Sequence, residues 1–146
     1  MKKLLQLKAQ NEEDTKNFAR ELVSILKPND VVLLKGELGS GKTFLVKQIC
    51  RLLKTEDEAS SPSFAIIHQY FGPVPVNHFD FYRLHHEAEL DQLGWEELLT
   101  AGAITFIEWP ELVEKHLSRY YKITIELEDH LRIFTLLKFE KNSVGE

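Results

Sequence analysis

The sequence predicts an α/β domain whose sheet mixes parallel and antiparallel strands. Short apolar runs alternate along the chain with segments of helical periodicity, a pattern typical of a partly parallel sheet covered by helices. Two pairs of strand-like segments are separated only by short turns, which favours antiparallel pairing within each pair. The 146 residues and 43% apolar content fit a single core, so we expect one domain over residues 1–140 and a frayed tail over residues 141–146.

The N-terminal half is predicted to contain two strands and two helices. Residues 4–10 alternate like a half-buried strand, and Asn11 can cap a helix that continues to about Leu26. Residues 31–35, VVLLK, are typical of a strand buried on both faces, and a second helix is expected over residues 42–54. The inward-facing positions are Phe18, Leu22, Ile25 and Leu26 in the first helix, and Leu45, Val46, Ile49, Cys50 and Leu53 in the second.

The C-terminal half is predicted to contain more strands and shorter helices. A polar, acidic loop over 55–62 is followed by two strands, over 63–71 and 76–82, that are joined by a turn. One or two short helices are expected over 87–102, broken near Gly94, and a buried strand over 103–108. The chain then continues with a helix over 110–117, which has Pro110 in its first turn, and ends in a hairpin of strands 121–127 and 132–140.

The composition argues against several classes of protein. The net charge is −5 and the lysines are scattered, so the sequence offers no basic face with which to bind nucleic acid unaided. No apolar run approaches the length of a membrane helix, and the N-terminus lacks the apolar core of a signal peptide. The single cysteine, Cys50, cannot form an internal disulfide and is expected to be a small buried residue. We therefore expect a cytoplasmic protein.

A glycine-rich loop stands between the strand at 31–35 and the helix at 42–54. Residues 36–43, GELGSGKT, match the pattern G-x-x-x-x-G-K-[ST] at every fixed position. Its glycines let the backbone curl so that successive N–H groups point at phosphate oxygens, and the helix adds its positive N-terminal end. A chance match in a glycine-containing turn is the alternative. The expected nucleotide contacts are Gly36, Glu37, Leu38, Gly39, Ser40, Gly41, Lys42, Thr43 and Phe44, with Lys42 at the β- and γ-phosphates and the Thr43 hydroxyl on Mg²⁺.

The buried strand at 103–108 ends in a carboxylate where a turn residue is usual. Proteins with such a phosphate loop usually carry a second apolar strand ending in an acid that holds the metal or polarises the attacking water. Glu108 fits this pattern, although aspartate is more common, and its longer side chain suits a water better than a directly bound metal. We expect Glu108 to be the hydrolytic carboxylate, acting with Lys42, and include it among the candidate metal ligands. A solvated acid at a strand end is the alternative.

Three further residues are candidates for this site. Asp80 ends another apolar strand and is a candidate Mg²⁺ ligand, with a turn-forming aspartate as the alternative. Arg83 can face the phosphates, although a surface ion pair is favoured. Trp109 directly follows Glu108 and can stack on a base or simply fill space, whereas Trp95 is expected in the core.

The histidines do not suggest a metal site. No cysteine or carboxylate spacing completes a tetrahedral set around them. We expect these histidines, at positions 78, 85, 86 and 116 (His78, His85, His86 and His116), to be solvated or to cap helices.

Five stretches together resemble the TsaE family, formerly called YjeE: GELGSGKT, SSPSF, NHFDFYRL, ELDQLGWEELL and FIEWPE. The resemblance covers about residues 5–140. Members of that family are small bacterial ATPases required for threonylcarbamoyladenosine (t6A) modification of tRNA. The resemblance implies a three-layer P-loop NTPase-type fold, ATP or ADP bound with Mg²⁺, and weak ATPase activity that partners activate. The implied partners are the proteins TsaD and TsaB, so that tRNA is reached only indirectly.

The resemblance also implies residue roles. The segment 60–64, SSPSF, resembles a switch-like loop near the γ-phosphate, where Ser63 stands in place of the family's usual threonine. Serine keeps the hydroxyl but loses the methyl group that limits its rotamers, so a plain turn is the alternative to a nucleotide-sensing Ser63. The remaining implied roles are phosphate and metal contact for Lys42 and Thr43, a second magnesium-associated acid at Asp80, hydrolysis at Glu108, and contact with the adenine at Trp109.

Two other functions compete with a partner-activated ATPase. A small-molecule kinase usually needs an arginine-rich lid, and the arginines of this chain are not clustered. An ATP-dependent docking switch with incidental hydrolysis is the closer alternative, because loops beside a nucleotide can change shape with it. The guanine-reading N-K-x-D motif is absent, which favours ATP over GTP. Weak self-association is left open.

Overall fold

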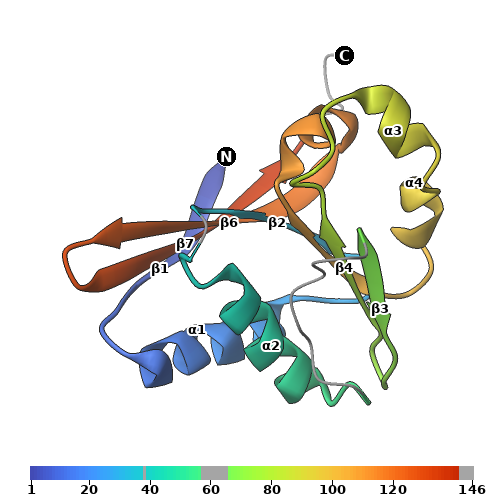
Figure 1. The fold of residues 1–146 in the computed structure, drawn as a ribbon. Helices are drawn as coiled ribbons and strands as arrows, with labels where there is room; N and C mark the ends of the chain where they lie inside the picture. Colours follow the sequence, from blue (N-terminus) through green and yellow to red (C-terminus); the bar gives the residue numbers. More distant parts are fainter. Residues whose placement is uncertain (38, 57–65, 142–146) are drawn as a thin grey trace.

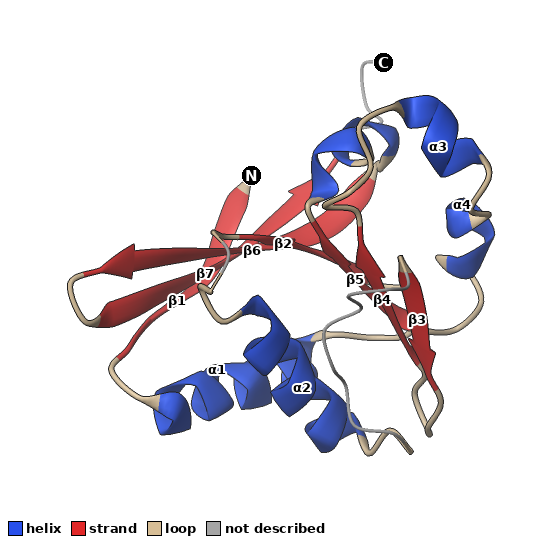
Figure 2. Cartoon of the chain, in the orientation of Figure 1, coloured by secondary structure: helices blue, strands red, loops and turns tan. Residues whose placement is uncertain are grey.

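The computed structural model describes residues 1–37, 39–56 and 66–141, and within them seven strands form one mixed sheet in the order β1-β7-β6-β2-β5-β4-β3 (Figure 1 and Figure 2). The strands are β1 (Lys2–Ala9), β2 (Val31–Lys35), β3 (Ile67–Tyr70), β4 (Val76–Asp80), β5 (Ile104–Glu108), β6 (Arg119–Glu128) and β7 (Leu131–Glu140). The helices are α1 (Glu12–Ile25), α2 (Lys42–Leu53), α3 (Glu87–Asp91) and α4 (Trp95–Leu98), with 3₁₀ turns η1 (Pro110–Leu112) and η2 (Glu114–His116). No helix in these ranges is long and apolar enough to cross a membrane.

The centre of the sheet is parallel and its flanks are antiparallel. β4, β5, β2 and β6 are parallel neighbours, whereas β7 pairs antiparallel with both β6 and β1, and β3 pairs antiparallel with β4. This arrangement confirms the predicted mixed sheet and the terminal hairpin of β6 and β7. Because the carboxyl ends of parallel strands meet at one edge, the residues that end or follow β2, β4 and β5 come together there.

Two layers of helices and turns enclose this sheet. α1 and α2 lie along one face, and α3, α4 and the 3₁₀ turns lie toward the other (Figure 1). Successive side chains of β2 point alternately into the two cores: Leu34 packs under α1 and α2, whereas Leu33 packs on the opposite side of the sheet. Trp95 and Cys50 are buried in these two cores, which confirms both predicted positions.

The first helix begins where the sequence predicts. The Asn11 side chain accepts a hydrogen bond from the backbone N–H of Asp14 at 2.9 Å and thereby satisfies one of the free donors of the first turn. Three acidic residues occupy that turn and complement the helix dipole. The local pattern is therefore sufficient to fix the start of α1.

Residues 110–117 do not form the predicted α-helix. The N–H of Val113 bonds to the carbonyl of Pro110, and the N–H of His116 bonds to the carbonyl of Val113, which is the tighter 3₁₀ spacing. The Glu114 carboxylate accepts hydrogen bonds from the Tyr120 hydroxyl at 2.6 Å and from Lys122 Nζ at 3.0 Å. These bonds tie the second turn to β6. The prediction was wrong because this tertiary contact overrides the helical pattern.

The strands around the β3–β4 hairpin are shorter than predicted. β3 comprises Ile67–Tyr70, and residues 63–65 of the expected strand lie outside the described residues. β4 ends at Asp80 because its carboxylate accepts the N–H of Tyr82 at 3.0 Å, which turns the chain. The predicted break near Gly94 is confirmed, since Gly94 adopts φ 65° between α3 and α4. Residues 142–146 of the expected tail also lie outside the described residues.

Candidate functional site

The glycine-rich loop leaves the end of β2 and enters α2. Gly39 and Gly41 have φ angles of 79° and 107°, which only glycine adopts without strain, and Gly41 is the cap of the helix. The Lys42 side chain folds back over this loop, where Nζ donates a hydrogen bond to the carbonyl of Gly36 at 2.7 Å. Lys42 is only 5% exposed. The loop therefore holds its lysine in a buried position at the edge of the sheet.

Tight packing inside the loop explains the glycine at position 36. A Cβ there would lie 2.7 Å from Ser40 Oγ and 3.1 Å from the carbonyl oxygen of Ile125. Ser40 is itself buried, and its hydroxyl has no hydrogen-bond partner within the described ranges. A buried hydroxyl without a partner in a phosphate-loop sequence is the observation expected where a ligand oxygen supplies the missing bond.

Two carboxylates stand at the same edge as Lys42. In the parallel pairing of β4 and β5, Asp80 lies opposite Glu108, and Glu108 lies opposite Leu34 of β2. Burial lowers the pKa of Lys42, and the negative charges of Glu108, Asp80 and Glu111 oppose that shift. The structure thus brings the predicted lysine and both predicted acids into one charged cluster.

The same surroundings raise the pKa of Asp80, whereas they lower the pKa of Lys42. Burial raises the pKa of Asp80, and the nearby charge of Glu108 adds to the increase. The hydrogen bond from the Tyr82 N–H and the charges of His78 and Lys42 act against it. The ionised form of Asp80 is therefore less stable in this site than it is in water.

Glu108 is buried, so the alternative of a solvated acid at a strand end does not hold. The residue is 4% exposed, and its Oε2 lies 2.5 Å from Nε2 of His78. His78 is 0% exposed. The expectation that His78 is solvated or caps a helix is wrong, because the strand alternation that directs Asp80 to this face of β4 also directs His78 there.

The other histidines match their expectation. His86 is the N-cap residue of α3, and its backbone N–H bonds to the Glu89 carboxylate at 3.1 Å. His85 and His116 are exposed. The period-2 pattern of β4 is the signal that could have separated His78 from this group.

Trp109 lies directly over the lysine. Its backbone is in the left-handed region at φ 57°, and the Lys42 Nζ sits 4.1 Å from the centre of its ring. The Tyr82 ring packs against the indole with centroids 4.8 Å apart. Trp109 therefore belongs to the site, where it covers the lysine between the loop and the end of β5.

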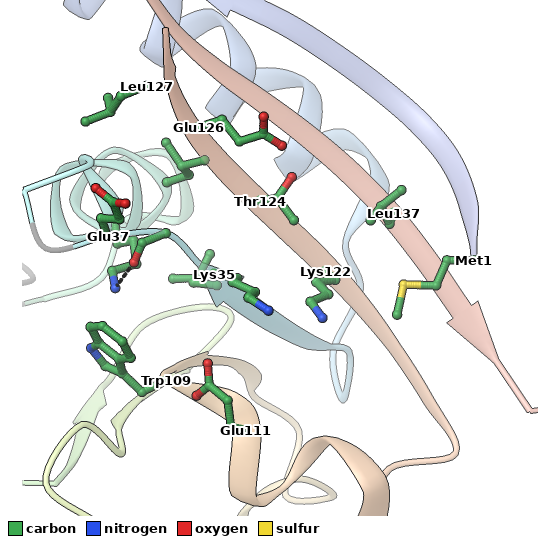
Figure 3. A pocket seen from close by; sticks show the side chains of 14 residues that line it. Met1, Lys35, Glu37, Trp109, Glu111, Lys122, Thr124, Glu126, Leu127 and Leu137 are labelled. Carbon is green, nitrogen blue, oxygen red and sulfur yellow. Dashed lines mark hydrogen bonds between the residues drawn. The ribbon is translucent and has the colours of Figure 1, made fainter.

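A cavity of about 690 Å³ opens beside this cluster (Figure 3). Figure 3 shows Trp109, Glu111 and Glu37 at one end, while side chains of β6, including Thr124 and Glu126, follow its length. Lys42 and Gly36 also line it, whereas Asp80 and Glu108 are not among its lining residues. Its volume is in the range of small-molecule sites, which run from about 300 to 1,000 Å³.

For the other predicted site residues, the structure gives an element and a degree of exposure, or leaves them outside the described ranges. Thr43 and Phe44 lie in the first turn of α2 and are partly buried, and Arg83 is exposed on the segment after β4. Leu38 and the whole of the 60–64 segment, including Ser63, lie outside the described residues.

The parallel core of the sheet and the loop between β2 and α2 define a protein of the P-loop NTPase-type α/β class. A family model described as "Threonylcarbamoyl adenosine biosynthesis protein TsaE" matches residues 9–133. The chain therefore belongs to the TsaE family, and the resemblance found in its motifs is confirmed.

Individual relatives agree with this assignment. A Rickettsia bellii protein named tRNA threonylcarbamoyladenosine biosynthesis protein TsaE is 44% identical over 109 residues, covering 73% of this chain and 74% of the relative. A Bacillus subtilis (strain 168) protein of the same name is 36% identical over 118 residues, covering 80% of this chain and 73% of the relative. The crystal structure of Bacillus subtilis YdiB superposes with a TM-score of 0.75 and 30% identity over 90% of this chain and 83% of that one.

Proposed function

We propose that this TsaE-family protein is an ATPase that binds Mg-ATP at the 36–43 loop and serves t6A modification of tRNA together with the proteins TsaD and TsaB. Membership of a threonylcarbamoyl adenosine biosynthesis family supports the pathway. The observation that carries the enzymatic part is the buried Glu108, which ends β5 at the same sheet edge as Lys42.

The loop has the chemistry to bind the phosphates of ATP. Lys42 supplies a positive charge at the start of α2, where the helix end adds a partial positive charge of its own. In the present structure this ammonium is bonded to the carbonyl of Gly36, so binding exchanges that bond for a stronger one to a phosphate oxygen. The unpartnered hydroxyl of Ser40 is a further donor within the loop.

We propose that Mg²⁺ is held by oxygen donors at this edge. The Thr43 hydroxyl and the Asp80 carboxylate are ligands of the kind that Mg²⁺ prefers and would hold the ion, which would supply positive charge against the phosphates. The raised pKa of Asp80 fits this role, because a divalent cation would relieve the cost of its ionised form.

Glu108 is proposed to orient and deprotonate the water that attacks the γ-phosphate. A carboxylate buried at this position has little competition from bulk water, so its interaction with one bound water is strong. Glu108 is also the third candidate metal ligand, but one of its two oxygens is already hydrogen-bonded to His78. This favours the water-orienting role over metal binding.

The base of the nucleotide is proposed to lie against Trp109. The indole lines the cavity that extends from the loop along β6, so one of its faces is available to a ligand while Lys42 contacts the ring. The negative net charge and the absence of a basic run favour a partner protein, and not this chain, as the part that holds tRNA. We also propose that the protein acts in the cytoplasm, because its single cysteine, Cys50, fits a reducing compartment.

The contact between Lys42 and Trp109 also supports the second candidate, a docking switch. Phosphate binding draws Lys42 toward the ligand and so changes what Trp109 packs against. If a partner recognises the surface around Trp109, ATP binding alone can create the docking state, with hydrolysis incidental.

Steady-state ATP hydrolysis, measured on the purified chain alone and with the matching TsaD–TsaB complex, tests the proposal. We expect a slow basal rate that rises when the complex is added. A Lys42→Ala preparation, purified identically, shows how much activity comes from contaminants. ATP binding with no turnover in either condition would overturn the ATPase and favour the docking switch.

A further inference from the structure

We propose that His78 is a positioning residue that holds the Glu108 carboxylate in the orientation needed for ATP hydrolysis. The inference rests on the proposed function and deepens it. It assigns a role in hydrolysis to a residue that is neither part of the phosphate loop nor among the predicted nucleotide and metal contacts. It is carried by one hydrogen bond, by the burial of both partners and by an incompletely bonded imidazole.

The hydrogen bond joins two neighbouring strands of the sheet. His78 lies near the middle of β4 and Glu108 at the end of β5, and these strands are adjacent and parallel (Figure 2). Nε2 of His78 is 2.5 Å from Oε2 of Glu108, with side-chain exposures of 0% and 6%. Because the His78 side chain is fully buried and that of Glu108 nearly so, bulk water competes little for this contact.

The contact determines which part of Glu108 is free to act. The glutamate backbone is fixed by β5, but its side chain has three rotatable bonds and can turn in several directions. A donor at Nε2 binds Oε2 and leaves Oε1 as the oxygen available to a water molecule. Hydrogen bonds from a buried neighbour restrict a reactive group in this way and keep it near its productive geometry.

A purely structural role would give a different pattern of bonds. Asn77, the preceding residue of β4, points to the opposite face, and its amide nitrogen donates to the carbonyl of Leu98 and the hydroxyl of Thr105, both at 3.1 Å. Its hydrogen bonds serve the packing of the sheet. His78 instead forms its hydrogen bond through Nε2 with the carboxylate of Glu108. Its Nδ1 is buried and has no hydrogen-bond partner among the described residues. A buried group of this kind needs an explanation, and a role at the neighbouring carboxylate is the one that we infer.

Three variants separate positioning from packing. His78→Leu fills space without a donor, His78→Gln keeps a donor near the position of Nε2, and Asn77→Ala removes the neighbouring structural bonds. We expect His78→Leu to lower kcat by about 10- to 100-fold with ATP affinity unchanged, which is the scale of losing an outer-sphere hydrogen bond to an active-site group. His78→Gln should recover most of the rate. Asn77→Ala should lower the melting temperature but keep kcat per folded molecule.

A spectroscopic measurement tests the contact independently of turnover. The ¹⁵N-coupled imidazole signals of His78 should show a proton on Nε2 that is shifted by hydrogen bonding, and Glu108→Ala should abolish that shift. Absence of the shift in the wild-type protein would overturn the inference. So would a His78→Leu variant that loses stability but keeps the wild-type kcat. If the wild-type protein itself hydrolyses no ATP with its partners, the proposed function fails, and the positioning role fails with it.

Discussion

Asp80 and Glu108 face each other across the register of the parallel strands β4 and β5, and Lys42 interacts with both from the start of α2. Two acids and one base are thus held together where water has limited access. The cost of burying these charges is visible in the shifted pKa values of Lys42 and Asp80. A ligand whose own charges lie opposite those of Lys42 and Asp80 would remove part of this cost, and its binding would be stronger as a result.

The half-buried carboxylate of Asp80 gives a stability prediction. Burial raises its folded-state pKa, so the folded protein binds this proton more tightly than the unfolded chain does. Ionised Asp80 therefore lowers stability at neutral pH, and the loss disappears as pH falls through the raised pKa toward the ordinary value of 3.8. Asp80→Asn should have a higher melting temperature than wild type at pH 7, with a gap that narrows on acidification.

Thermal unfolding of both proteins across this pH range, without nucleotide or Mg²⁺, makes the comparison. Asp91→Asn, on the exposed surface of α3, is the control and should show no such pH-dependent gap. A lower melting temperature for Asp80→Asn at pH 7 would mean that the Tyr82 hydrogen bond and the nearby positive charges outweigh the cost of burying the carboxylate.

The packing inside the phosphate loop gives a second prediction. Gly36→Ala places a Cβ 2.7 Å from Ser40 Oγ and 3.1 Å from the carbonyl oxygen of Ile125. Overpacking of this kind costs about 1–3 kcal/mol, measurable as a reduced free energy of unfolding in urea. In a Ser40→Ala background the closer contact is removed, so the same substitution should cost less. An equal cost in both backgrounds would show that Ser40 is not the source of the strain.

Trp109 is predicted to contribute to nucleotide affinity. Trp109→Ala should weaken ADP binding by about 1–3 kcal/mol, the usual contribution of an aromatic ring stacked on a base. Trp109→Phe keeps a ring and should lose less. Isothermal titration with ADP and with inorganic pyrophosphate distinguishes the alternatives: a loss for ADP alone supports stacking on the base. Equal losses for both ligands would mean that Trp109 acts on the phosphates through Lys42.

Elements fixed by local chemistry were predictable from the sequence. Asn11 starts α1 through its own hydrogen bond, and Gly94 separates α3 from α4 because it adopts a positive φ. The strand at 31–35 was recognisable because burial on both faces demands a continuous apolar run. Loop residues such as Lys42 follow a fixed pattern, so their place at the end of β2 was also predictable.

Elements fixed by distant contacts were not predictable. The helical pattern of 110–117 gave way to 3₁₀ turns because Glu114 bonds to Tyr120 and Lys122 of β6. The period-2 pattern of β4 could have predicted that His78 shares a face with Asp80, but its partner Glu108 is thirty residues away along the chain, and no local motif joins them. Its role became apparent only when the strand register placed both side chains on one face of the sheet.

The most direct test of the account is the Glu108→Gln variant, which keeps the size of the side chain and removes its ability to take a proton. ATP affinity and steady-state hydrolysis are measured on the same preparation in the presence of TsaD and TsaB. The account predicts ATP affinity close to wild type and a loss of turnover of about 10²- to 10⁴-fold, the usual contribution of a general base. Hydrolysis at the wild-type rate would contradict it and remove Glu108 from the chemistry.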